Sequence, residues 1–351
     1  MESFHNQTCL VVGGAGFVGS NLVRLLLKDG CLAITIVDNL LSAERRNVPE
    51  DPRVRFVEAS IADDVILGKL SDEYEYVFHL ATYHGNQSSI TNPLEDHANN
   101  LITTLKLYET IKHFRRLKKV VYSASGCTLA PHTYEQAVAT TEDGPLPIEL
   151  DSPYQISKVV GEFYSVYYHH QHKLPTVRAR FQNVYGPGEI LGAGRWRGTP
   201  ATVWRNVTPT FIYRALKRLP LKVENQGLAS RDFIFVEDIA RGLMRCATAG
   251  KPGDVYNLAS GVETSILELA TLINQLTGNP AAIEFLPARP WDRSGKRFGS
   301  TEKAKRAIGF EARVLLPEGL SKTVEWTRQN LPTIDSSIQK HDSQMKVFAQ
   351  V

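Results

Sequence analysis

A glycine-rich turn near the N-terminus places the strongest constraint on the fold of this chain. The apolar run 8–12 leads into Gly13-Gly-Ala-Gly-Phe-Val-Gly19, and a helical pattern follows. Glycine at 13 permits a tight turn, glycine at 16 lets the backbone approach a pyrophosphate, and glycine at 19 lets the helix pack on the strand. The N–H groups at the start of that helix attract anions. The turn therefore predicts a dinucleotide-binding strand–helix unit.

An acidic residue at the end of the next apolar run indicates which dinucleotide is bound. Asp38 ends the second predicted strand, 19 residues after Gly19. At this spacing and position an acid accepts hydrogen bonds from a ribose diol. A carboxylate there repels the 2′-phosphate of NADP, so the sequence predicts NAD as the cofactor.

Short apolar runs alternate with helical patterns as far as residue 181. The predicted strands are 9–12, 33–37, 54–57, 76–80, 120–122 and 176–181, with helices between them, for instance 18–28 and 101–114. Continuous apolar strands separated by helices indicate a parallel sheet covered on both faces. Right-handed crossovers then give an α/β, doubly wound (Rossmann) fold. Further strands are expected at 231–236 and 255–258, and helices at 264–278 and 300–308.

The pattern changes after residue 181, which indicates a second part of the fold. Residues 183–205 are rich in Gly, Arg and Trp, and long loops of this kind are often functional. We predict a Rossmann domain from 1–182 and 233–258, and a smaller, discontinuous α/β substrate-binding lobe from 183–232 and 259–330. Residues 331–351 are polar and patternless, and we expect a loose tail.

Composition excludes several other classes of protein. The 351 residues carry a formal net charge of +3, which argues against a nucleic-acid binder. A hydrophobic share of 42% excludes global disorder. The four cysteines form no CxxC pair, and neither a signal-like segment nor a membrane-length apolar run is present. We expect a cytoplasmic protein that needs no metal and contacts no membrane.

A tyrosine and a lysine four residues apart predict the catalytic pair. Tyr154 and Lys158 share one face of a predicted helix. A tyrosine side chain is neutral near pH 7, because its reference pKa is ~10. A nearby ammonium and a nicotinamide cation would stabilise the phenolate, which makes Tyr154 a base for a hydroxyl proton during hydride transfer.

Together, these motifs resemble the extended short-chain dehydrogenase/reductases, and within them the nucleotide-sugar epimerases and dehydratases. The resemblance covers about residues 7–330. It implies that Ser125, in Val121-Tyr-Ser-Ala-Ser-Gly-Cys127, hydrogen-bonds the reacting sugar hydroxyl. The segments 79–81 and 100–104 match family segments that line the cofactor. The implied cofactor-binding residues are Gly13, Gly16, Phe17, Val18, Gly19, Asp38, Asn39, Leu80, Ala81, Asn100, Tyr154 and Lys158.

Three further matches are typical of enzymes that bind a nucleotide-diphosphate sugar. Asn206-Val-Thr-Pro209 resembles a turn that contacts the diphosphate, Ser230-Arg231-Asp232-Phe233 a segment whose arginine pairs with it, and Arg289-Pro-Trp-Asp292 a pair that holds phosphate and ribose. Guanidinium groups suit phosphate because they donate two parallel hydrogen bonds. The loop with Ser88 and Ser89 either contacts sugar hydroxyls or caps a helix. The implied substrate-binding residues are His84, Ser88, Asn183, Arg195, Arg197, Asn206, Arg231, Arg289 and Asp292.

The two residues after Ser125 distinguish the reactions of the resembled group. Those reactions share a transient oxidation at sugar C4. The dehydratases carry two carboxylates at these positions and the decarboxylases keep a Glu at the second, whereas this chain has Gly126 and Cys127. A C4 epimerase needs no such group, since the keto sugar rotates and hydride returns to its other face. We therefore expect a C4 epimerase, with a dehydratase disfavoured by the missing carboxylates.

Cys127 leaves an alternative reaction open. A free cysteine is often a small apolar residue, but a thiol beside a C4 ketone can also act as an acid or base at C5 or C3. The GDP-mannose 3,5-epimerases have a cysteine at this motif position, although their second acid/base, a lysine, falls here on Val207. The alternative is therefore a C5 or 3,5-epimerase that uses Cys127 as a catalytic residue.

Two other classes of protein share part of these motifs. A net NAD-dependent oxidoreductase on a non-nucleotide substrate would use the glycine turn and Tyr154 but would have no need of Asn206, Arg231 and Arg289. A non-catalytic NAD-binding regulator would need neither Tyr154 nor Lys158. Relatives commonly dimerise through a four-helix bundle that includes the helix with the tyrosine. The aromatic stretch 161–168 fits such burial, so we predict a homodimer.

Overall fold

A seven-stranded parallel sheet forms the centre of the computed structural model, which describes residues 3–128 and 133–348. The strand order is β11-β6-β5-β4-β1-β2-β3, so the chain leaves β1 towards one edge and β4 towards the other. The doubly wound fold predicted from the sequence is therefore confirmed. The strands are β1 (Thr8–Val12), β2 (Ala33–Asp38), β3 (Val54–Glu58), β4 (Tyr76–His79), β5 (Lys119–Ser125), β6 (Thr176–Phe181) and β11 (Val255–Leu258).

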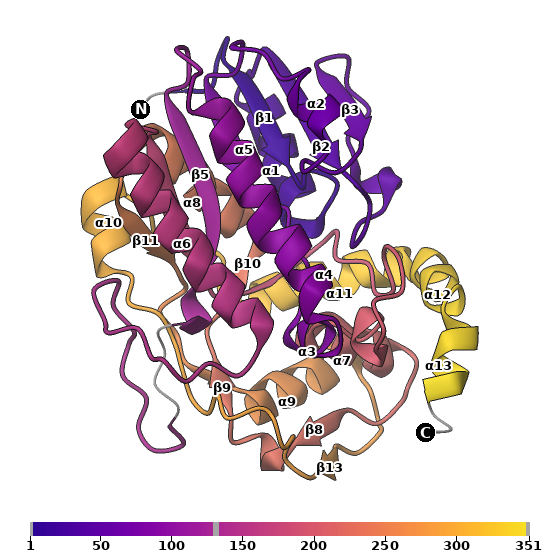
Figure 1. Cartoon of the computed structure of the whole chain (residues 1–351). Coiled ribbons are helices and arrows are strands. Elements are labelled where there is room, and N and C mark those ends of the chain that lie inside the picture. The colour runs from indigo at the N-terminus through magenta and orange to yellow at the C-terminus, as the bar shows by residue number, and fades with distance from the viewer. Residues whose placement is uncertain (1–2, 129–132, 349–351) are drawn as a thin grey trace.

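Helices cover both faces of this sheet (Figure 1). Helices α1 (Phe17–Lys28) and α8 (Val236–Ala249) pack on one face, and α5 (Thr103–Ile111) and α6 (Pro153–His172) on the other. Successive residues of β1 alternate between the two cores: Val11 belongs to the first and Val12 to the second. Because both faces are buried, every residue of the strand can be apolar, which explains the continuous runs in the sequence.

A smaller group of elements, here named the smaller lobe, lies below the sheet in Figure 1 and has its own apolar core. Three helices contribute to it, namely α7 (Val207–Leu216), α9 (Ile266–Thr277) and α11 (Leu316–Gln329). Three two-stranded sheets accompany them, formed by β7 (Asn183–Tyr185) with β10 (Phe233–Phe235), β8 (Lys222–Glu224) with β13 (Glu284–Leu286), and β9 (Ser230–Arg231) with β12 (Thr264–Ser265). The division into two domains at residues 182, 232 and 258 stays a prediction.

The strand expected at 231–236 is interrupted at Asp232. Its buried carboxylate accepts hydrogen bonds from the N–H of Ser260 at 2.9 Å, of Gly261 at 3.0 Å and of Gly299 at 3.2 Å. Burial raises the pKa of Asp232, and these hydrogen bonds oppose the rise. The aspartate thus joins three segments, and the strand divides into β9 and β10 around it.

The remaining helices are short. They are α2 (Asp64–Leu67), α3 (Asn86–Thr91), α4 (Pro93–His97), α10 (Glu302–Ile308), α12 (Leu331–Gln339) and α13 (Asp342–Phe348). Helix α10 is followed by Gly309, which has a φ of +62°, as expected for a glycine after a helix. Across the described ranges, none of the helices combines the length and the apolar character needed to cross a bilayer.

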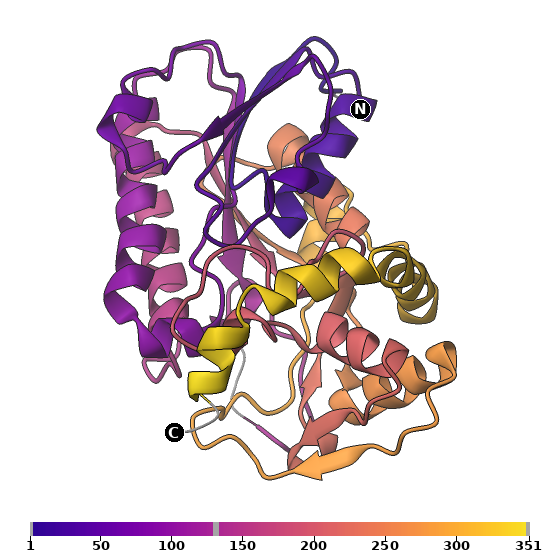
Figure 2. The same cartoon turned by 90° about the vertical axis from the view of Figure 1, so that its right-hand side faces the viewer.

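The C-terminal stretch differs from the loose tail expected. Helices α12 and α13 run across the junction between the sheet and the smaller lobe (Figure 2). Ile334 packs on Ile190 and Leu191, and Lys340 forms an ion pair with Glu44 at 2.6 Å. The ring Nε2 of His341 donates to the carbonyl of Gly192 at 2.9 Å. These partners are distant in sequence, so no local pattern could indicate them.

Candidate active site

A cavity of about 870 Å³ lies at the carboxyl edge of the sheet. One side is formed by the glycine turn, the ends of β2 and β5 and the start of α6. The other side is formed by α7 and by loops of the smaller lobe. Open α/β sheets bind their ligands at this edge, where the strand order changes direction.

The glycine turn has the geometry that its sequence predicts. Gly13 has a φ of +85°, and a Cβ there would lie 2.5 Å from the backbone N of Ala81. A Cβ at Gly19 would lie 2.2 Å from the carbonyl oxygen of Gly13. Helix α1 follows with no side chain capping it and no acid in its first turn. The positive end of its dipole thus faces a cavity that Phe17 and Val18 line.

Asp38 lies at the end of β2 with its carboxylate against the glycine turn. It accepts hydrogen bonds from the N–H of Ala15 at 3.0 Å and of Leu40 at 2.9 Å. Burial raises the pKa of Asp38, and these bonds oppose the rise. Asp38 and Asn39 both line the cavity, so the acid stands where the ribose diol of a dinucleotide is expected.

Helix α6 presents Tyr154 and Lys158 to the same cavity. The ammonium of Lys158 donates to the carbonyl of Ser123 in β5 at 2.9 Å and lies 5.8 Å from the centre of the Tyr154 ring. Ser125, at the end of β5, also lines the cavity. A fixed positive charge at this distance favours a phenolate on the tyrosine. The structure thus brings the three predicted residues together.

The loop after β4 holds the start of α6. Ser152, the N-cap residue of α6, donates to the side-chain oxygen of Asn86 at 3.0 Å. The hydroxyl of Ser89 accepts from the N–H of Tyr154 at 3.1 Å. For Ser89, the structure therefore shows the capping alternative. Ser88 is fully buried, away from the cavity, and its hydroxyl has no partner among the described residues.

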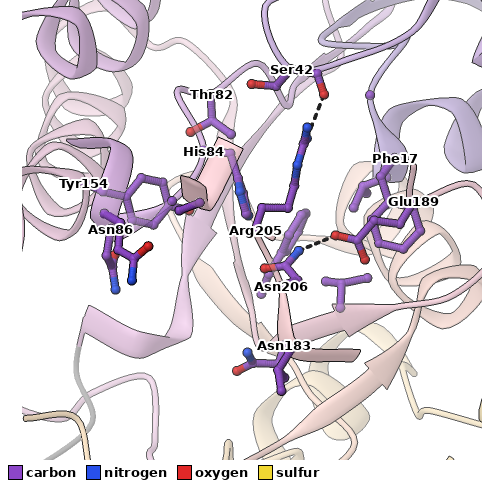
Figure 3. Close-up of a pocket in the computed structure, with 18 of the residues that line it drawn as sticks. Phe17, Ser42, Thr82, His84, Asn86, Tyr154, Asn183, Glu189, Arg205 and Asn206 are labelled. Atoms are coloured by element: carbon purple, nitrogen blue, oxygen red, sulfur yellow. Dashed lines mark hydrogen bonds between the residues drawn. The ribbon is translucent and has the colours of Figure 1, made fainter. Parts of the chain in front are cut away.

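His84 and Tyr154 face each other inside the cavity (Figure 3). Their ring centres are 6.3 Å apart, in an edge-on arrangement. Burial lowers the pKa of His84 to about 3, and the charges of Arg205, Arg197 and Lys158 contribute to the shift. The imidazole is therefore neutral near pH 7, and each of its nitrogens can serve a ligand as a donor or an acceptor.

Asn183 and Asn206, which the sequence predicts to bind substrate, line the opposite wall of the cavity. Asn206 donates its side-chain N–H to one carboxyl oxygen of Glu189, a residue that sequence reasoning missed (Figure 3). Burial raises the pKa of Glu189 to about 7, while the hydrogen bond from Asn206 and the charge of Arg205 oppose the rise. A lone Glu in a glycine-rich loop carries no motif that marks it.

Three predicted phosphate- and ribose-binding residues also line this wall. Arg231 donates to the carbonyl of Gly295 and to the hydroxyl of Ser294, each at 2.6 Å, and lies 3.8 Å from Asp292. Arg289 pairs with Glu224 and its guanidinium lies 5.7 Å from the centre of the Trp291 ring. Both arginines are thus already oriented by the chain itself, which suits a preformed anion site.

Among the predicted site residues whose side chains the structure describes, four do not line the cavity. Ser88 is one of them. Asn100 accepts hydrogen bonds from Thr82 and from the N–H of Tyr83, and donates to Asp96 and Ser157. Its amide therefore ties α6 to the loop after β4 and has no group left for a cofactor. Arg195 and Arg197 point to the loop after β2.

Cys127 is the one predicted site residue whose side chain lies outside the described part of the structure. Its backbone belongs to a short 3-10 turn, Gly126–Thr128, directly after β5. The role expected for its thiol therefore stays a prediction.

Comparison with known proteins agrees with the arrangement of this cavity. The model of the NAD dependent epimerase/dehydratase family matches residues 9–259. The chain belongs to this family. Its relatives are nucleotide-sugar epimerases and dehydratases, so the chain is an enzyme of this superfamily, and its cofactor is NAD.

Individual relatives cover almost the whole chain. The Bordetella bronchiseptica enzyme WbmF, in complex with NAD+ and UDP, is 64% identical, with a TM-score of 0.88 over 97% of this chain and 98% of that one. A UDP-glucose 4-epimerase of Mycolicibacterium smegmatis is 33% identical over 91% of this chain and 98% of its own length. A dTDP-glucose 4,6-dehydratase of an Actinoplanes species is 30% identical over 92% of this chain and 98% of its own length.

The described residues fit the dinucleotide. The glycine turn leaves no room for side chains at Gly13 and Gly19, α1 has no capping group, and Asp38 stands at the end of the neighbouring strand. These are the features that bind a diphosphate and a ribose diol. That the predicted cofactor-contacting residues named above, other than Asn100, hold NAD stays a prediction.

Proposed function

We propose that this protein is an NAD-dependent UDP-sugar 4-epimerase. The observation that carries the proposal is the convergence of Tyr154, Lys158 and Ser125 with the glycine turn and Asp38 on one cavity. NAD, when bound, supplies a reversible two-electron oxidation at C4 of the sugar. The rest of the reaction depends on proton transfer, on orientation of the sugar and on space for the sugar to turn.

Tyr154 is the group that takes the proton from the O4 hydroxyl and later returns it. Lys158 is held by the carbonyl of Ser123 and keeps a positive charge beside the tyrosine ring in both steps. Ser125 donates to, or accepts from, the same hydroxyl and fixes its position. His84, which is neutral near pH 7, offers a further hydrogen bond to the sugar or the cofactor without adding charge.

The residue after Ser125 favours an epimerase over a dehydratase. A Cβ at Gly126 would lie 2.2 Å from the side-chain nitrogen of Gln182. Because the Gln182 side chain is flexible and can withdraw, the discriminating feature is the residue itself: Gly126 supplies no acid where a dehydratase of the resembled group carries a carboxylate. A C4 epimerase needs no acid or base here, because its keto sugar rotates and hydride returns to the other face.

The other half of the cavity suits a nucleoside diphosphate. Arg231 and Arg289 supply charge for the phosphates, Asn206 an amide, and Asp292 a carboxylate for a ribose diol. The UDP bound to WbmF, the 64% identical relative, supports uridine as the nucleoside. We therefore assign UDP-sugars as the substrate class.

The test of this function is a panel of UDP-sugars incubated in heavy water, with products identified by NMR. We expect one sugar of the panel to equilibrate with its C4 epimer and to keep every carbon-bound hydrogen. Solvent deuterium at C5 or C3 would contradict the C4 assignment and support the alternative through Cys127. In that case Cys127→Ala would abolish the exchange; under the C4 assignment the same variant keeps its turnover.

We also propose that the protein is a homodimer. Three apolar side chains on α6 are exposed, Ile156 at 49%, Phe163 at 55% and Tyr167 at 51%. Their spacing of seven and four residues places them on one face of the helix, as in a helix–helix interface. Phe163→Asp is expected to give a monomer in light scattering, whereas a wild-type monomer would contradict the proposal.

A further inference from the structure

A long loop of the smaller lobe reaches back to the loop that follows β2. In this loop, residues 186–206, the N–H of Arg195 donates to the carbonyl of Leu41 at 3.0 Å. Arg197 donates to the hydroxyl of Ser42 at 3.0 Å, and Arg205 to its carbonyl at 2.9 Å. The contacted segment directly follows Asp38 and Asn39. The side chains of Arg197 and Arg205 thus meet the part of the chain expected to surround the cofactor.

Arg205 stands inside the cavity, on the side of the glycine turn. In Figure 3 its side chain runs from the backbone beside Asn206 towards Ser42, between His84 and Phe17. The two terminal nitrogens of its guanidinium bond to carbonyl groups, including that of Ala193. Its Nε is buried and has no partner among the described residues. Asn206 instead points to Glu189, so the two consecutive residues serve different parts of the cavity.

The chain supplies little negative charge to balance the guanidinium groups of Arg205 and Arg197. Arg197, beside Arg205, is 2% exposed, and two of its three guanidinium nitrogens have no partner among the described residues. Within the described ranges neither arginine forms an ion pair. Glu189 is the acid that faces Arg205, and with a pKa raised to about 7 by burial it is only partly ionised at neutral pH. Glu44, the other acid nearby, is paired with Lys340.

Burying two cations without a counter-charge is costly, and an anionic ligand removes that cost. Two anions are expected in the cavity, the diphosphate of the cofactor and that of the substrate. Arg231, Arg289 and Asn206 form a separate set for the second. We expect the N-terminus of α1, which begins at Phe17, to face the first, and in Figure 3 Phe17 lies to one side of the Arg205 side chain.

We propose that Arg205, backed by Arg197, binds the diphosphate bridge of NAD from the smaller lobe, opposite the N-terminus of α1. The diphosphate is then held between backbone N–H groups on one side and a guanidinium on the other. The segment after residue 181, from which a substrate-binding role is expected, thereby also contributes to the cofactor site. The proposal rests on NAD occupying this cavity and is independent of which sugar carbon is epimerised.

The experiment compares NAD and UDP binding in Arg205→Gln, with Arg218→Gln as a matched control that removes an exposed charge from the same lobe outside the cavity. Each full-length protein is freed of cofactor, and binding of NAD is measured by titration calorimetry. Binding of UDP is then measured with NAD at saturation. Circular dichroism and thermal unfolding confirm that each variant is folded.

The expected result is NAD binding weakened about tenfold to hundredfold in Arg205→Gln, with UDP binding within about twofold of wild type. Arg218→Gln should match wild type in both. Weakened UDP binding with unchanged NAD binding would assign Arg205 to the substrate, and no change in either would make it purely structural; each result overturns the proposal.

If Arg205→Gln does not fold, Arg205→Lys, which keeps the charge but loses the forked guanidinium, should weaken NAD binding several-fold. A protein that binds NAD in this way but epimerises no UDP-sugar would contradict only the proposed function.

Discussion

Two loops border the same cavity, and they are built in opposite ways. The turn at 13–19 depends on its backbone: Gly13 and Gly19 are required because backbone atoms lie within 3 Å of where a Cβ would be. The loop at 186–206 depends on long side chains that cross to carbonyl groups far earlier in the chain, such as that of Ser42, which lies 163 residues before Arg205. The first is specified by local geometry and the second by contacts formed only in the folded chain.

The glycines of the second loop show the same difference. Gly194 has a φ of +83°, and a Cβ there would lie 2.3 Å from the carbonyl oxygen of Leu41. A Cβ at Gly192 would lie 2.5 Å from the carbonyl oxygen of Ser337 in α12. These glycines thus allow two distant segments to approach the second loop. In the first turn Gly13 does the same for Ala81, whereas Gly19 meets only atoms of the turn itself. The second loop is the place where the cofactor side, the smaller lobe and the C-terminal helices meet.

The largest effect is expected when the proton transfer at Tyr154 is removed, on the side of the cavity that carries the glycine turn. Tyr154→Phe keeps the ring and removes the hydroxyl that takes the sugar proton. We expect epimerisation to fall by about 10²- to 10⁴-fold, with NAD and UDP binding unchanged. Turnover within tenfold of wild type, measured by NMR of the product, would rule out Tyr154 as the base.

The next effect tests whether the glycine turn depends on sterics. Gly19→Ala would place a Cβ 2.2 Å from the carbonyl of Gly13, so the turn has to open. We expect a loss of about 3 kcal/mol in the free energy of unfolding and loss of retained NAD after gel filtration. Gly278→Ala is the control, because no atom lies within 4 Å of its added Cβ, although its φ of +63° adds some strain. Equal behaviour of both variants would contradict the steric explanation.

A smaller, pH-dependent effect is expected on the side of the second loop. Burial raises the pKa of Glu189 to about 7 from its ordinary value of 4.5. Between these values the unfolded chain releases the proton while the folded chain keeps it, so stability falls as pH rises and the loss is complete above about pH 7. Glu189→Gln removes this dependence. From pH 5 to 8 we expect wild type to lose about 2 kcal/mol more than the variant, measured by urea unfolding; parallel pH profiles would contradict it.

The smallest effect is expected for the C-terminal helices, which pack on the loop at 186–206. The ion pair of Lys340 with Glu44 is partly exposed, at 37% and 24% of the two side chains. Lys340→Ala is therefore expected to cost less than about 1 kcal/mol of stability. His341→Ala should cost more, since His341 is 4% exposed and bonded to Gly192. The reverse order in thermal unfolding would show that the ion pair, rather than the buried ring, holds the helices.

The same contrast explains how far the sequence predicts this protein. The doubly wound sheet, the glycine turn, Asp38 and the pair Tyr154 and Lys158 follow from periodicity and short motifs, and the structure gathers them at one cavity. Helices α12 and α13 and the acid at Glu189 could not be predicted, because their environment comes from distant segments. Asn100 shows that a motif match does not fix a residue's role, since its amide is already hydrogen-bonded to α6 and to the loop after β4.

The central claim is that oxidation and reduction take place at C4 of a UDP-sugar inside this cavity. Its most direct test uses the UDP-sugar that reacts in the panel, labelled with deuterium at C4 and incubated with the purified protein without added NAD. We predict that both C4 epimers form and that the deuterium stays at C4, as read by NMR and mass. Loss of the deuterium to solvent, or inversion at another carbon with C4 unchanged, would contradict the account.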